Sequence, residues 1–175
     1  MQLSWEHSQA REPYQFLDEV MMPNYPFLLD TLTGLDVNVT NTSKARLIKI
    51  LDTCHFNLCC LKLELENAQP FLPRSLAQEL TLFPETWVDL SSLNSLKSLA
   101  MSLDFEQTFH AVDERIRFRS MINILSSLKS SALQVIDIFF SLYPDDIEKF
   151  HWEDMDDVLH RIAQENPSLQ LQLSS

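Results

Sequence analysis

One arrangement of hydrophobic and polar positions recurs along the chain. An apolar residue is followed by two residues of any kind and then by three apolar residues at alternating positions. The four clear copies are Leu32, Leu35, Val37 and Val39; Leu58, Leu61, Leu63 and Leu65; Leu96, Leu99, Met101 and Leu103; and Leu133, Ile136, Ile138 and Phe140. Alternation directs successive side chains to opposite faces of an extended strand, so each copy predicts a β-strand with one buried face.

Two weaker stretches extend this pattern. Ala77, Leu80 and Leu82 fit a further copy between the second and third clear ones, and Leu169, Leu171 and Leu173 predict a last strand. If the copy at Ala77, Leu80 and Leu82 is a strand, we expect it to lie in the sheet between the strands that begin near Leu58 and Leu96.

Helical periodicity separates several of these strands. The apolar residues expected on one helical face are Leu47, Ile48, Leu51 and Cys54 in the first helix, Phe118, Met121, Ile122 and Leu125 in the second, and Met155, Val158, Leu159 and Ile162 in a helix from about Glu153 to Glu165. Short strands that recur between helices are typical of leucine-rich repeats. We therefore expect an α/β fold, an irregular leucine-rich repeat solenoid whose parallel strands stack in a curved sheet with helices on the outer face.

The pattern also divides the chain. Residues 31–175 predict a solenoid of about five repeats. Residues 1–30 do not follow the repeat but are too apolar for a free tail, so we expect an N-terminal cap or remnant segment there.

The amino-acid composition excludes several kinds of partner and several classes of enzyme. The formal net charge is -12, and an acidic surface repels phosphate, so we expect neither nucleic acid nor an anionic membrane as partner. A protein partner with a basic segment would be attracted instead. Gly34 is the only glycine, which excludes the glycine-rich phosphate loops and the nucleophile elbow of common enzyme classes.

The three cysteines cluster at Cys54, Cys59 and Cys60 without the spacing of a disulfide framework, and the first residues do not resemble a signal peptide. We therefore expect a cytoplasmic or nuclear protein. A zinc site beside His55 is not expected, because Cys59 and Cys60 point to opposite faces of a strand and no second pair follows. We expect no cofactor, metal or catalytic residue. A hydrolase that uses paired carboxylates stays open, because such pairing is spatial.

The register of the expected strands places the residues between the buried apolar positions in two rows on the exposed concave face. One row contains Asp36, Lys62, Thr81, Ala100 and Asp137, and the next contains Asn38, Glu64, Phe83, Ser102 and Phe139. The exposed sheet of a solenoid is its usual binding face. The predicted partner-binding residues are Asp36, Asn38, Lys62, Glu64, Phe83, Ser102, Asp137 and Phe139.

The C-terminal half carries a family resemblance. The stretch "SSALQVIDIFF" and the later "FHWEDMDDVLHRIAQENPSLQLQL" combine a strand, a tryptophan, an aspartate-rich helix and a proline before the last strand. These residues resemble the irregular leucine-rich repeat region of fungal F-box proteins of the basidiomycete type. The resemblance covers about residues 32–173. It implies the substrate-binding part of a ubiquitin ligase receptor, because family members bind substrates through these repeats.

Two departures qualify the resemblance. Regular leucine-rich repeats carry Asn or Cys three positions after the second alternating apolar residue, where this chain has Thr40, Glu66, Asp104 and Ser141. In addition, "QFLDEVMMPNYPFLLDTL" does not carry the F-box pattern through which family members meet the ligase adaptor. The expected function is a non-catalytic protein-interaction module that lacks its F-box. The alternative is a free-standing leucine-rich repeat adaptor unrelated to ubiquitin.

Overall fold

The computed structural model describes residues 2–3, 29, 31–39, 44–65, 88–104, 111–141 and 150–174. Its strands are β1 (Gln2–Leu3), β2 (Gly34–Val39), β3 (Cys60–Leu65), β4 (Ser98–Asp104), β5 (Val135–Ser141) and β6 (Gln170–Ser174). They form one sheet in the order β1-β2-β3-β4-β5-β6, and every neighbouring pair is parallel. The expectation of an α/β fold with a parallel sheet is confirmed.

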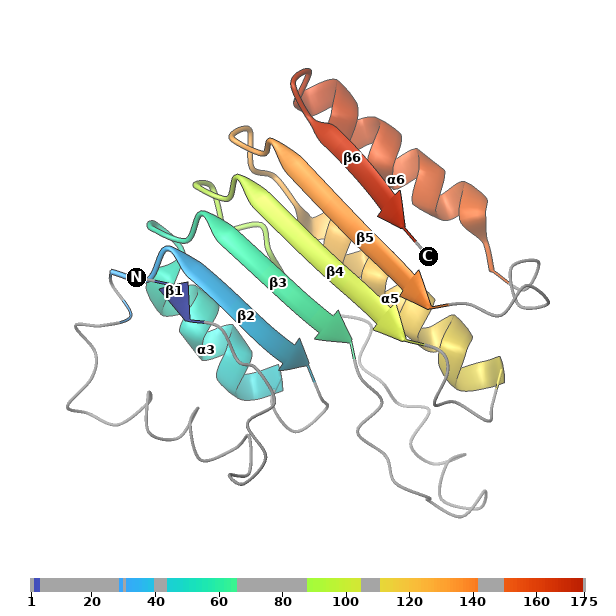
Figure 1. Cartoon of the computed structure of the whole chain (residues 1–175), viewed down its shortest axis with the longest axis horizontal. Coiled ribbons are helices and arrows are strands. Elements are labelled where there is room, and N and C mark those ends of the chain that lie inside the picture. The colour runs from blue at the N-terminus through green and yellow to red at the C-terminus, as the bar shows by residue number, and fades with distance from the viewer. Residues whose placement is uncertain are drawn as a thin grey trace, which may run out of the picture.

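Three helices within the described residues accompany the sheet: α3 (Lys44–Cys54), α5 (Ala111–Ser127) and α6 (Trp152–Glu165). All three lie on the same side of the strands, which leaves the opposite side of the sheet without a described helix (Figure 1). Each coincides with a helix that the hydrophobic periodicity predicts. None of the helices in the described ranges is both long and apolar enough to cross a lipid bilayer.

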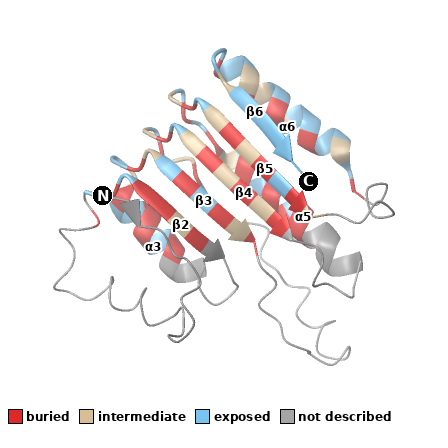
Figure 2. Ribbon diagram, in the orientation of Figure 1, coloured by how far each residue is buried: buried red, intermediate tan, exposed pale blue. Residues whose placement is uncertain are grey.

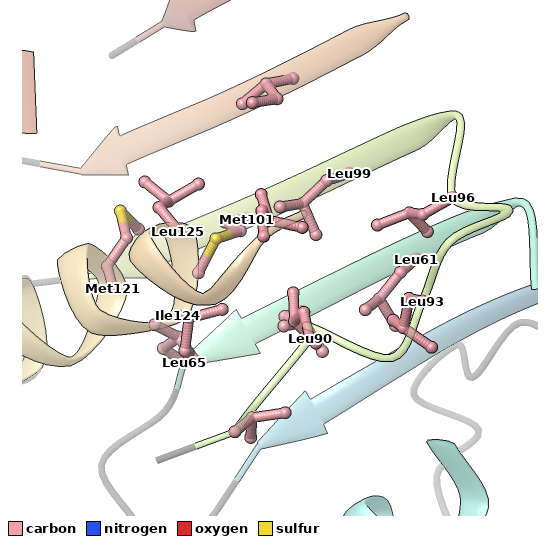
Figure 3. Close-up of a cluster of buried hydrophobic side chains, with 14 of the residues drawn as sticks. Leu61, Leu65, Leu90, Leu93, Leu96, Leu99, Met101, Met121, Ile124 and Leu125 are labelled. Carbon is pink, nitrogen blue, oxygen red and sulfur yellow. The ribbon is translucent and has the colours of Figure 1, made fainter. Parts of the chain in front are cut away.

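The core lies between the sheet and these helices. The alternating apolar residues of neighbouring strands are in register, so Leu63 pairs with Met101 and Met101 with Ile138. All three side chains are buried, whereas intermediate and exposed residues alternate with them along the strands (Figure 2). Figure 3 shows that Leu90, Leu93 and Leu96, from the segment that precedes β4, contribute to the same core.

One helical face differs from the expectation. In α3 the buried residues are Leu47, Ile50, Leu51 and Cys54, while Ile48 is exposed. Positions i, i+3, i+4 and i+7 lie on one face of a helix, and counting from Leu47 they select Ile50 rather than Ile48. The prediction that Ile48 faces the core is therefore wrong.

The expected sheet order also needs a correction. β3 pairs directly with β4, so Lys62 is aligned with Ala100 and Glu64 with Ser102. No strand stands between them, so the expectation of a further strand between β3 and β4 is wrong. The weaker copy of the repeat at residues 77–83 itself lies outside the described residues.

Successive turns are joined by a ladder of backbone hydrogen bonds just before each strand. The carbonyl oxygen of Thr33 accepts hydrogen bonds from the N–H groups of Cys59 and Cys60, at 2.8 and 3.0 Å. Equivalent bonds run from the start of each following strand to the carbonyls of Cys59, Lys97 and Gln134. The ladder aligns the strand starts, so residues at equivalent positions of β2 to β6 stand in straight rows across the sheet.

The predicted N-terminal cap is described at a few positions only. Gln2 and Leu3 form β1, which pairs with Gly34 and Leu35 at the edge of β2. Leu29 is buried in the core, and the rest of the segment 1–30 lies outside the described residues.

Candidate partner-binding face

We define the open face as the side of the sheet opposite to the three helices. Its central feature is an ion-pair network across β2 and β3. Lys62 Nζ lies 2.7 Å from Glu64 Oε1 and 3.3 Å from Asp36 Oδ2. The hydrogen bond from Lys62 to Glu64, followed by that to Asp36, raises the pKa of the Lys62 ammonium above its ordinary value. The network therefore holds one positive charge between two carboxylates at a fixed place on the face.

The next two strands, β4 and β5, present different kinds of side chain on the open face. β4 presents Ser98, Ala100 and Ser102, which are all small and partly exposed. β5 presents Asp137 and Phe139 in register with Ala100 and Ser102. The short side chains of β4 thus separate the charged network on β3 from a carboxylate and an aromatic ring on β5.

Phe139 is an exposed aromatic residue of this face. Its side chain is 45% exposed, and it is aligned with Ser102 on one side and Ser174 on the other. Because both neighbours are small, no large side chain at these two register positions covers the ring. Aromatic residues contribute strongly to binding energy where a partner removes them from water.

The structure brings most of the predicted partner-binding residues together. Six of them have described side chains that lie on the open face: Asp36, Lys62, Glu64, Ser102, Asp137 and Phe139. The backbone of Asn38 is aligned with Glu64, and its side chain lies outside the described part. Phe83 also lies outside it.

The cysteine cluster is divided between the two sides of the sheet. Cys54 is buried, and burial raises the pKa of its thiol to about 11. Cys60 is exposed at the start of β3, and the half-buried Cys59 thiol donates a hydrogen bond to the Asn57 carbonyl at 3.5 Å. Within the described ranges, no three His, Cys, Asp or Glu side chains form a group suited to a metal ion.

Sequence reasoning missed one feature of the sheet. Leu171 and Leu173 were expected only as part of a last strand, but in β6 they are 41% and 60% exposed. The hydrophobic alternation has the same appearance in β6 as in β5. The distinguishing signal is the position of β6 at the end of the strand order, which leaves its second edge without a neighbouring strand in the described structure.

No protein-family model matches the chain, and neither the curated proteins nor the solved structures contain a match.

Proposed function

We propose that this chain is a non-catalytic protein-interaction module that binds its partner through the open face. The observation that carries the proposal is the arrangement of that face, where Phe139 is exposed on the side of the sheet that no described helix covers. The network of Asp36, Lys62 and Glu64, on the other side of β4 from Phe139, offers charges of both signs for pairing with a partner. An exposed aromatic beside polar groups is the composition of a binding surface.

We further propose that the fold is an irregular leucine-rich repeat solenoid. Strands that follow one another in sequence order, with all the described helices on one side of the sheet, support this assignment. The first apolar position of each repeat has a similar environment: Leu32, Leu58, Leu96 and Leu133 are all buried, next to the backbone hydrogen bonds that join successive strand starts. A solenoid offers its partner a continuous sheet rather than a single pocket.

Within this class, we propose the substrate-binding part of an F-box-type ubiquitin ligase receptor that lacks its F-box. The support is the resemblance of residues 32–173 to the repeat region of such receptors. The net charge of -12 favours a substrate with a basic segment. We propose a cytoplasmic or nuclear location, where these ligases act.

The test is an affinity purification of the tagged chain from its native cells, with quantitative mass spectrometry of the proteins that co-purify. Wild type is compared with Phe139→Ala on the open face and with Phe56→Ala, which removes another exposed phenylalanine from a turn. A partner of the open face is lost with Phe139→Ala and retained with Phe56→Ala. Equal recovery of all proteins by the three chains would contradict binding through this face.

The same experiment tests the link to ubiquitin. Cullin and its adaptor, recovered above background, would support a role in a ubiquitin ligase. If both are absent while a partner depends on Phe139, the chain is a free-standing adaptor and the receptor proposal is wrong.

A further inference from the structure

The C-terminal edge of the sheet carries a second apolar surface, which is separate from the open face. Leu171 is aligned with Ile136 and Leu173 with Ile138. The two isoleucines are fully buried, whereas the two leucines are 41% and 60% exposed. The apolar rows of the core therefore continue to the edge strand, where the described structure no longer covers them.

The backbone of β6 presents hydrogen-bonding groups at this edge. The N–H of Gln170 donates to the Gln134 carbonyl at 2.8 Å and therefore points toward β5. Backbone groups of successive strand residues point to alternate sides, so the N–H and C=O groups of Leu171 and Leu173 point away from β5. The same two residues thus offer an added strand both apolar side chains and backbone groups.

β6 lacks the usual protection of an edge strand. Natural edges are guarded by charged residues, proline or bulges that prevent pairing with another chain. The strand reads QLQLS and contains neither a charge nor a proline, although the chain as a whole is strongly charged. Its composition is compatible with strand addition from outside.

The charge beside this edge indicates the kind of partner. Helix α6 contains the acidic residues Glu153, Asp154, Asp156, Asp157 and Glu165, and Arg161 is its only lysine or arginine. Arg161 is bound to Glu165 and to the Ser126 carbonyl on α5, so it does not neutralise the four acids of the first turns.

These four acids lie near the end of β6. They follow Trp152, whose ring centroid is 5.5 Å from that of Phe140 on β5. Phe140 comes one residue after Phe139, which is aligned with Ser174 of β6. The start of α6 therefore places negative charge at the end of the sheet where β6 reaches Ser174.

We propose that the open edge of β6 binds an extended segment of a partner protein by strand addition. The segment has apolar residues at alternate positions, which continue the rows of Leu171 and Leu173. It also has lysine or arginine residues at the end that lies beside Ser174, next to the acids of α6. A second copy of this chain fits less well, because a two-fold β6–β6 pair would bring two acidic α6 helices toward each other.

Fluorescence anisotropy with designed peptides tests this proposal on the full chain. One probe has leucine, valine and leucine at alternate positions between threonines, followed by three lysines, and a second has the lysines before this block. The controls are a scrambled peptide of the same composition and a peptide with glutamates in place of the lysines. We expect saturable binding of at least one lysine probe and weak binding of both controls. If the scrambled peptide bound equally well, charge alone would explain the binding and the proposal would be overturned.

Variants of Leu173 separate the two parts of the contact. Leu173→Pro removes an N–H group that points away from β5, at the edge of β6, where proline is tolerated in a strand. Leu173→Thr removes the apolar side chain but keeps this N–H group. We expect Leu173→Pro to weaken peptide binding by about tenfold and more than Leu173→Thr does, since it loses a hydrogen bond as well as the leucine. Leu173→Lys adds a charge at an exposed position and provides a folded variant that must also lose binding. Unchanged binding by Leu173→Pro or Leu173→Lys would overturn the proposal.

Two further measurements show where the peptide binds and whether a second copy of the chain takes its place. Amide hydrogen exchange with and without the probe should slow at Leu171 and Leu173, whereas Gln170 and Gln172 already bond to β5. Sedimentation of the free chain should give a monomer, and a dimer that Leu173→Pro dissociates would assign the edge to a second copy and contradict this proposal. The result can be distinguished from that of the proposed function, because Leu173→Pro alters the edge of β6 and is read by peptide binding, whereas Phe139→Ala alters the open face and is read by the proteins that co-purify.

Discussion

The hydroxyl oxygen of Ser130 lies 2.8 Å from the carbonyl oxygen of Leu96, although the two residues belong to different turns of the chain. The same hydroxyl lies 3.1 Å from the Asn94 carbonyl and accepts a hydrogen bond from the Ala132 N–H at 3.3 Å. Ser130 is buried, so it satisfies polar backbone groups of two successive turns where water is excluded. One small side chain thus joins the turn before β4 to the turn before β5.

Replacement of this serine should destabilise the protein. Ser130→Ala leaves the Leu96 carbonyl and the Ala132 N–H without the hydroxyl, and an unsatisfied buried polar group costs roughly 1–3 kcal/mol. We expect a loss of that size in the free energy of unfolding, measured by urea denaturation. Ser126→Ala, at an exposed position of α5, is the matched control and should change the free energy by less than about 0.5 kcal/mol. Equal effects of the two changes would contradict a structural role for the Ser130 hydroxyl.

The ion-pair network on the open face should contribute little to stability. Lys62 is exposed, and exposed ion pairs contribute about 0.2–1 kcal/mol. Because the folded state raises the Lys62 pKa, the contribution is complete below the ordinary value of 10.5 and is lost as pH rises through the folded value. Thermal unfolding of wild type and Lys62→Met should therefore differ by a constant small amount between pH 6 and 9, and the difference should shrink at higher pH and at high salt. A large, salt-independent difference would contradict this account.

Thiol reactivity should distinguish the exposed Cys60 from the buried Cys54. Cys54 has a thiol pKa of about 11, so at pH 8 only about one molecule in a thousand carries the reactive thiolate there. Cys60 is exposed on the open face. We expect a disulfide reagent to modify Cys60 first and to reach Cys54 only after unfolding, as followed by mass spectrometry of digested protein. Cys60→Ser is the control, and rapid native modification of Cys54 would show that its burial is wrong.

Local periodicity was enough to predict many of the elements. The alternation in the four clear copies and in the last strand predicted β2 to β6, and the helical periodicities predicted α3, α5 and α6. Both signals arise from which side chains face a common core, so they survive in one sequence without any partner information. The rows of the open face follow from the same alternation once the strands are parallel and aligned.

The remaining features depend on distant contacts. The direct pairing of β3 with β4 could not be predicted, because the copy of the alternation at Ala77 lies between them in the sequence and the sequence does not specify which strands are neighbours. The role of Ser130 depends on a carbonyl 34 positions earlier in the chain. The exposure of Leu173 depends on the strand order, since Leu169, Leu171 and Leu173 show the same alternation as the apolar residues of the buried strands.

The row that contains Leu63, Met101, Ile138 and Leu173 allows the same change to be compared at the centre and at the edge of the sheet. Leu63→Ala removes a fully buried side chain, and such truncations cost roughly 2–5 kcal/mol because they leave a cavity. Leu173→Ala removes a side chain that is already 60% exposed and should cost less than about 1 kcal/mol in the isolated chain. Urea denaturation of both variants measures this contrast. When the peptide that binds at β6 is added, wild type should gain stability and Leu173→Ala should gain less, because the stabilisation by a ligand of the folded state rises with the logarithm of its affinity. Equal losses from the two truncations would mean that Leu173 is buried in solution and would remove the basis for a binding edge at β6.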